Sequence, residues 1–136
     1  MDKSVHDILL IDDDADDAEL TIIALRKNHL ANPIVHIDDG EKAMEFLFDG
    51  EAKPGLILLD LKMPRVDGIQ ILRRLKDDPA RKDIPVIAML SSKEGKKYLE
   101  SFHVKADSYV VKPVDPIQFF AAVAEMGIYS LIVTAQ

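Results

Sequence analysis

Leu56-Ile57-Leu58-Leu59-Asp60 is the stretch that decides the fold, because it joins a continuous aliphatic run to a terminal carboxylate. A run that is apolar at every position is typical of a parallel strand covered on both faces. A second such run, Ile8-Leu9-Leu10-Ile11, ends at Asp12 and Asp13. In an open parallel sheet, ligands bind at the carboxyl ends of the strands. The sequence therefore predicts that three acids meet at one ligand-binding edge.

Similar apolar runs alternate with helix-period segments along the whole chain. Strands are predicted at residues 6–12, 33–37, 55–60, 84–90 and 108–111. Turn signals such as Asp39-Gly40 and Asp67-Gly68 separate these runs from the helices. Five strand–helix units predict a doubly wound α/β fold with a parallel sheet. We expect one domain over residues 1–136, with its core in 1–126 and an apolar tail in 127–136.

Each helical segment predicts a stripe that faces the core. The predicted stripes are Leu20, Ile23 and Ala24; Ala43, Phe46 and Leu47; Ile71, Leu72 and Leu75; Tyr98, Leu99 and Phe102; and Ile117, Phe120, Ala121 and Ala124. The last helix carries a second apolar stripe of Phe119, Val123 and Met126, and the apolar tail follows it. Exposed apolar surface often marks a partner site. We therefore expect a homodimer through the last helix and the tail, with folding of the tail onto its own sheet as the alternative.

The composition is that of an ordinary acidic globular domain. The 136 residues are 48% hydrophobic and 30% charged, with a formal net charge of -7 and no cysteine. This charge argues against a nucleic-acid surface, and the lack of cysteine excludes disulfides and zinc–thiolate sites. The amino terminus lacks the apolar core of a signal peptide, and no apolar run approaches the ~20 residues of a membrane helix. We expect a cytoplasmic protein without nucleic-acid or membrane partners.

The strand-end acids require a compensating cation. Two like charges ~4 Å apart repel by roughly 4 kcal/mol at an effective dielectric constant of 20. Lys112 closes the apolar run 109–111 and is a candidate for part of this compensation. A hard divalent cation with oxygen ligands would supply the rest. None of the four histidines is predicted to be a metal ligand, because they share no spacing.

Three further acids have a simpler interpretation. Asp14, Asp16 and Asp17 lie at the start of the first predicted helix. Acids at this position cap the helix and stabilise its positive end. We therefore expect them to be structural.

The acid pair Asp12-Asp13, the segment 59–64 with Asp67-Gly68, and Lys112-Pro113 together resemble the receiver domain of two-component response regulators. The resemblance covers nearly the whole chain. It implies a flavodoxin-like sheet with strand order 2-1-3-4-5. It also implies that Asp60 accepts a phosphoryl group from a histidine kinase or a phosphotransfer protein.

The resemblance also implies roles for the neighbouring residues. Mg²⁺, with Mn²⁺ as a plausible substitute, would be held by Asp12, Asp13, Asp60 and the backbone carbonyl of Lys62, with Asp12 acting through a bound water. Lys112 would pair with the phosphoryl oxygens, and Tyr109 matches the aromatic switch position. Metal and lysine together supply the positioning and charge neutralisation that phosphoryl transfer needs. Such a protein is a signalling phosphoacceptor, not an enzyme, although it catalyses its own phosphotransfer and slow dephosphorylation.

A narrower resemblance concerns the partner. Residues 14–20, 39–43 and 128–133 are similar to the single-domain regulators that partner bacterial phytochrome kinases. This implies a histidine kinase of the phytochrome type, although such regulators also serve other sensory kinases.

One position departs from the family pattern. Leu90 stands where the family places the Thr or Ser that bonds the phosphoryl group, and Ser91 follows it. Because a shift of one residue in a strand reverses the side-chain direction, either a bulge presents Ser91 or the hydroxyl is missing. The alternative function is therefore a pseudo-receiver, an interaction module with weak or uncoupled phosphorylation. A phosphatase of the haloacid-dehalogenase type, suggested by Asp12-Asp13-Asp14, would need a longer chain.

Overall fold

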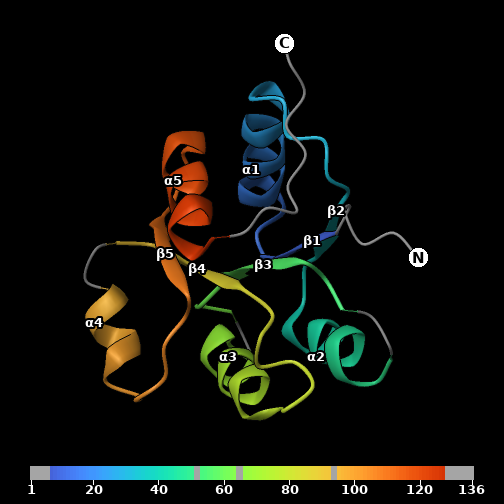
Figure 1. The fold of residues 1–136 in the computed structure, drawn as a ribbon, viewed down its shortest axis with the longest axis vertical. Coiled ribbons are helices and arrows are strands. Elements are labelled where there is room, and N and C mark those ends of the chain that lie inside the picture. Colours follow the sequence, from blue (N-terminus) through green and yellow to red (C-terminus); the bar gives the residue numbers. More distant parts are fainter. Residues whose placement is uncertain (1–6, 51–52, 64–65, 93–94, 128–136) are drawn as a thin grey trace.

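The computed structural model describes residues 7–50, 53–63, 66–92 and 95–127. Strands and helices alternate strictly along these residues (Figure 1). The strands are β1 (Ile8–Ile11), β2 (Ile34–Ile37), β3 (Leu56–Asp60), β4 (Val86–Leu90) and β5 (Ser108–Val111). The helices are α1 (Ala15–Lys27), α2 (Gly40–Phe48), α3 (Gly68–Asp77), α4 (Gly95–Glu100) and α5 (Pro116–Met126). The predicted strands are confirmed to within two residues at each end.

The five strands form one parallel sheet in the order β2-β1-β3-β4-β5, which confirms the predicted fold. The strand order reverses at β1, which lies between β2 and β3. At such a switch point the connections leave on opposite faces, and a crevice opens at the carboxyl ends of the strands. The topology therefore brings the ends of β1 and β3 to a potential binding site.

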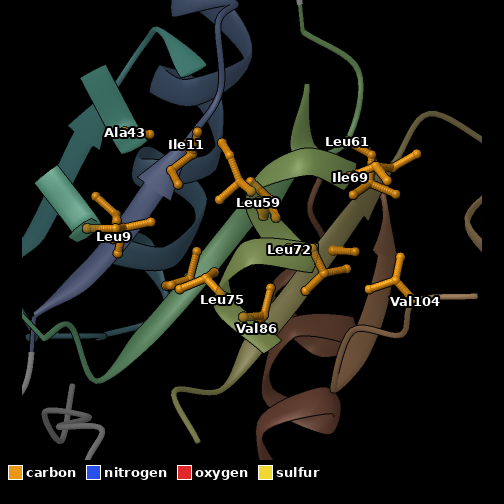
Figure 2. Close-up of a cluster of buried hydrophobic side chains, with 14 of the residues drawn as sticks. Leu9, Ile11, Ala43, Leu59, Leu61, Ile69, Leu72, Leu75, Val86 and Val104 are labelled. Carbon is orange, nitrogen blue, oxygen red and sulfur yellow. The ribbon is translucent and has the colours of Figure 1, made fainter. Parts of the chain in front are cut away.

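Helices cover both faces of the sheet. In Figure 1, α1 and α5 lie on one face, and α2, α3 and α4 lie on the other. The side of α2, α3 and α4 holds the larger cluster of buried aliphatic side chains, which includes Leu59 of β3 and Leu72 and Leu75 of α3 (Figure 2). The residues of the central strands β1, β3 and β4 are all buried, as expected for a sheet covered on both faces.

Three of the predicted core stripes are wrong, two of them on α5 and α1 and the third in the α4 region. On α5 the buried residues are Phe119, Ala122 and Val123, whereas Ile117 is 78% exposed. On α1 the buried residues include Ala18 and Leu25. Leu20 and Ile23 of that helix are 59% and 41% exposed. Tyr98 and Phe102 of the α4 region are also exposed, and only Leu99 of that stripe is buried.

The physical reason on α5 is that two stripes share the same period. Residues 117, 120, 121 and 124 repeat at helical spacing, and so do residues 119, 122, 123 and 126. Periodicity alone does not determine which of the two stripes is buried. The direction in which the chain leaves β5 decides which stripe packs against the sheet. Phe119 and Val123 therefore belong to the core and cannot form a dimer surface. The tail residues 128–136 lie outside the described residues.

No helix within the described ranges is long and apolar enough to cross a membrane.

Candidate phosphoacceptor and metal site

The acids predicted from the sequence meet at the carboxyl edge of the sheet. Asp12 and Asp13 directly follow β1, and Asp60 is the last residue of β3. One carboxylate oxygen from each of these three residues lies within 4.8 Å of the others. Asp13 is exposed, whereas Asp12 and Asp60 are buried. The three acids therefore form a cluster with one side open to solvent.

Asp12 is the most enclosed of the three acids. Its side chain is 0% exposed, and its Oδ1 atom accepts a hydrogen bond of 3.0 Å from the backbone N–H of Asp14. Its Oδ2 atom is buried and makes no hydrogen bond to any described residue, although Lys112 Nζ lies 3.0 Å away as an ion-pair partner. A buried carboxylate oxygen with spare lone pairs, beside two more carboxylates, suits a hard divalent cation. The donor set of the site therefore fits Mg²⁺ or Mn²⁺.

Asp60 is held by two donors. Its Oδ1 atom accepts from the backbone N–H of Lys62 at 3.2 Å, and its Oδ2 atom accepts from Lys112 Nζ at 3.1 Å. Burial raises the pKa of Asp60 to about 6; Lys112 opposes this shift, and the nearby charge of Asp12 adds to it. The Asp60 carboxylate is thus ionised at neutral pH but easily neutralised. A cation arriving at the cluster would favour its charged form.

Lys112 connects the acids. Its side chain comes from the end of β5, and the Lys112–Pro113 peptide bond is cis. Burial alone would lower the pKa of Lys112, but the carboxylates of Asp12 and Asp60 outweigh that effect and raise the pKa. Lys112 therefore stays protonated and offsets part of the negative charge at the site, as the sequence predicted.

Asp17 is a site residue that sequence reasoning missed. Its Oδ2 atom accepts a hydrogen bond of 3.4 Å from Lys112 Nζ. Asp14 behaves as predicted, because it caps α1 by accepting from the N–H of Asp17. Asp17 lies within the first turn of α1, and its carboxylate reaches the lysine that follows β5. In the sequence, the one signal for this contact is that Asp17 follows the strand-end acids by about one helical turn.

Leu90 lies in a regular strand and not in a bulge. The ladder between β4 and β5 runs without interruption from Ile87↔Ser108 to Leu90↔Val111. The Leu90 side chain is buried in the cluster under α3 and α4, and a Cβ atom on Gly95 would lie 3.3 Å from its Cδ2 atom. Ser91 follows the strand and is exposed. The structure therefore gives no support to a bulge that presents the Ser91 hydroxyl.

Tyr109 and Lys62 lie around α4. The Tyr109 ring is half-buried against the same cluster, and Lys96 Nζ of α4 lies 5.2 Å from the ring centroid. Burial is the main cause that raises the Tyr109 pKa above its ordinary value. Lys62 is exposed, and its Nζ atom lies 5.9 Å from the ring centroid of Tyr98. Both contacts attach α4 to elements that border the site.

Gly68 brings α3 close to the site. A Cβ atom at this position would lie 2.6 Å from Leu61 Cα and would also collide with the Asp60 carbonyl. The N–H of Gly68 donates to the Leu61 carbonyl at 3.0 Å. Glycine is therefore required here because helix α3 begins against the backbone that carries Asp60.

Comparison with known proteins identifies a family. The family described as "Response regulator receiver domain" matches residues 8–124. Response regulator Rcp1 from Synechocystis sp. is 31% identical over 110 residues, which cover 77% of this chain and 75% of Rcp1. The phosphate regulon transcriptional regulatory protein PhoB from Pseudomonas aeruginosa is 33% identical over 114 residues, but the chain spans only 48% of that protein.

Solved structures agree with the sequence matches. The bacteriophytochrome response regulator AtBRR superposes with a TM-score of 0.85 at 34% identity, covering 97% of both chains. The Mn²⁺-bound form of Rcp1 superposes with a TM-score of 0.72 at 25% identity, covering 96% of this chain and 99% of that one. The Mn²⁺ in that relative accords with the oxygen-rich cluster of this chain.

Proposed function

Since this chain belongs to the response regulator receiver domains, we propose that it is a phosphorylation-dependent signalling switch whose phosphoacceptor is Asp60. The observation that carries the proposal is the convergence of Asp12, Asp13 and Asp60 within 4.8 Å, with Lys112 Nζ 3.1 Å from Asp60 Oδ2. In this proposal a carboxylate oxygen of Asp60 attacks phosphorus and forms an acyl phosphate, while the bond from phosphorus to the donor breaks. The donor is a phosphohistidine of a kinase or of a phosphotransfer protein.

The metal and the lysine have separate roles in the proposal. Mg²⁺ or Mn²⁺ would be held by Asp12, Asp13, Asp60 and the backbone carbonyl of Lys62. The bound cation would neutralise charge on the phosphoryl oxygens. Lys112 would leave part of its contact with Asp60 and pair with a phosphoryl oxygen, since its charge is already within reach. The same residues would support the protein's own phosphotransfer and slow dephosphorylation, so no separate enzyme activity is proposed.

We further propose a phytochrome-like histidine kinase as the partner. The similarity to a bacteriophytochrome response regulator supports this choice. A small depression of about 170 Å³ next to Lys112 also supports docking close to Asp60, because its lining includes Leu20, Ala24 and Pro113. A kinase of this class phosphorylates its partner inside the cell, so the proposal retains the expected cytoplasmic location. It includes no nucleic-acid partner.

The second candidate function is a pseudo-receiver, and Leu90 is the observation that favours it. Leu90 offers no hydroxyl to a phosphoryl group, and Ser91 is exposed at the end of a regular strand. In this version Asp60 is phosphorylated weakly, or its phosphorylation does not change the surface around Tyr109. The intact set of Asp12, Asp13, Asp60 and Lys112 favours phosphorylation over its complete loss.

Self-association also belongs to the proposal. Burial of Phe119 and Val123 removes two of the residues first expected at the dimer surface. Self-association is proposed to use the mainly apolar sequence Ile128-Tyr129-Ser130-Leu131-Ile132-Val133, which follows Gly127. An apolar segment of this kind favours burial against a second copy, most simply across a two-fold axis.

Phosphotransfer from a purified phytochrome-type kinase tests the proposed partner. The labelled kinase should pass its phosphoryl group to the parent protein and not to an Asp60→Asn variant, which keeps the shape of the side chain without its nucleophile. Equal labelling of both proteins would contradict the assignment of Asp60. Preferential labelling by an unrelated sensory kinase would contradict the assignment of the partner.

A further inference from the structure

The edge strand β2 reaches the acid cluster through His36. His36 lies opposite Leu10 in the register between β1 and β2. Its Nε2 atom is 2.8 Å from the backbone carbonyl oxygen of Asp12. Because a carbonyl oxygen only accepts hydrogen bonds, Nε2 must carry a proton, and His36 is the donor.

This hydrogen bond acts where the backbone ladder ends. The last paired residues of the two strands are Ile11 and Ile37. The N–H of Asp12 donates to the Ile37 carbonyl at 3.2 Å, and the chain of β2 then turns away into the Asp39 cap of α2. The His36 side chain thus supplies a donor to the next carbonyl. Both backbone groups of Asp12, its N–H and its carbonyl, are therefore hydrogen-bonded to β2.

The position of Asp12 matters more than that of an ordinary strand residue. Its carboxylate is 0% exposed, and its Oδ2 atom is ion-paired with Lys112 Nζ at 3.0 Å. The direction of this oxygen depends on the backbone of Asp12, on the Asp14 N–H that holds Oδ1 and on the Lys112 ammonium. A rotation of this backbone would move one of the three oxygens that now lie within 4.8 Å of one another.

We propose that His36 is a positioning residue, which holds the Asp12 backbone so that the three carboxylates meet at the distance a divalent cation requires. His36 is not a ligand in this role, because its donor nitrogen is engaged by the carbonyl. The link to phosphoryl transfer rests on the proposed function, whereas the link to metal affinity is independent of it. Groups behind metal ligands typically change affinity by roughly 10–100-fold when they are removed.

Solvent access to His36 allows a chemical test. His36 is half-buried and is one of the residues that line an open depression of about 510 Å³, together with Lys42, Glu45 and Phe46 of α2. A small donor molecule can therefore reach the space that a shortened side chain would leave.

The experiment compares the Mg²⁺ affinity of three variants by titration calorimetry. His36→Gln keeps an N–H donor of similar reach, His36→Leu keeps apolar bulk without a donor, and His36→Ala opens the space. We expect roughly tenfold weaker Mg²⁺ binding for His36→Leu and binding within about twofold of the parent for His36→Gln. Added imidazole should restore part of the affinity of His36→Ala. Val35→Ala, a neighbour on β2 that packs toward the opposite face of the sheet, controls for weakening of the strand.

Three results would overturn the proposal. The first is parental affinity in His36→Leu, and the second is an equal loss in His36→Gln and His36→Leu, which would assign the effect to ring packing. The third is that imidazole does not restore any Mg²⁺ affinity to His36→Ala. This comparison also decides the matter if urea titrations show that His36→Leu is not folded. Labelling of the parent by acetyl phosphate is measured separately. An unlabelled parent would refute the phosphoacceptor role while the metal comparison still decides the role of His36.

Discussion

Asp60 is the residue whose chemistry depends most on its surroundings. Its pKa of about 6 means that a proton competes with a cation for the carboxylate in mildly acidic solution. We expect Mg²⁺ affinity, measured by calorimetry, to be about tenfold weaker at pH 5 than at pH 7, because most Asp60 is protonated at the lower pH. In Asp60→Asn this part of the pH dependence should disappear. The same affinity at both pH values in the parent would show that Asp60 is not a ligand.

The raised pKa of Asp60 also predicts how stability varies with pH when metal is chelated. A carboxyl with a raised pKa binds its proton more tightly in the folded state than in the unfolded state. Its contribution to stability is therefore lost as pH rises from about 4 through 6. Asp60→Asn should accordingly be more stable than the parent at pH 7 in EDTA, by about 1–2 kcal/mol in urea titrations, and this gain should shrink below pH 5. A less stable variant at pH 7 would contradict the burial argument.

Leu90 is predicted to uncouple phosphorylation from the conformational change. A hydrogen bond to a charged group contributes roughly 1.5–3 kcal/mol, and Leu90 cannot make one to a phosphoryl oxygen. We expect Leu90→Thr to show a larger change in the Tyr109 NMR signals on treatment with acetyl phosphate and Mg²⁺ than the parent does. Ser91→Ala should behave like the parent, since Ser91 is exposed. Equal changes in the parent and in Leu90→Thr would mean that another group already supplies the bond.

The sequence predicted the centre of the site but not its surroundings. Asp12, Asp13, Asp60 and Lys112 each end or follow an apolar run, and parallel strands bring their carboxyl ends to one edge, so their proximity follows from the pattern. The contact of Asp17 with Lys112 and that of His36 with Asp12 depend on side chains that reach sideways from a helix and an edge strand. Such contacts depend on the twist of the sheet and on the side-chain rotamers, which the local sequence pattern does not encode.

At the scale of elements, the start of α3 is predicted to tolerate no side chain at Gly68. Gly68→Ala would force a Cβ atom against the backbone of Asp60 and Leu61, neither of which can move without disturbing the site. We expect a loss of about 1–3 kcal/mol in the free energy of unfolding, and weaker Mg²⁺ binding. Gly50→Ala is the matched control, because nothing lies within 4 Å of a Cβ atom there. Similar stability of the two variants would contradict the close packing of α3.

The helices show how well the hydrophobic pattern of the sequence predicts the buried face of each helix. The stripes of α2 and α3 were predicted correctly in their main residues, because polar residues occupy the opposite faces and leave one choice. On α5 almost every position is apolar, so two stripes compete and the predicted one was wrong. On α1 the buried Thr21 looked polar, although its hydroxyl donates to the Asp17 carbonyl and is thereby satisfied. On such helices, the connection to the sheet determines which face is buried.

At the scale of the whole molecule, self-association is predicted to depend on the segment after α5. Sedimentation of the full chain should give a dimer at tens of micromolar, whereas a chain ending at Gly127 should sediment as a monomer. Val123 is 6% exposed and Phe119 is 0% exposed, so neither is available as an alternative surface. A monomeric full chain, or a dimeric shortened one, would contradict the assignment to the tail.

The central claim is that the acid cluster and Lys112 make Asp60 a phosphoacceptor, and intact-mass measurement after treatment with acetyl phosphate and Mg²⁺ tests it most directly. The account predicts a mass gain of one phosphoryl group in the parent. It predicts no gain in Asp60→Asn and little gain when EDTA replaces Mg²⁺. A parent that gains no mass, or an Asp60→Asn variant that gains as much as the parent, would contradict it.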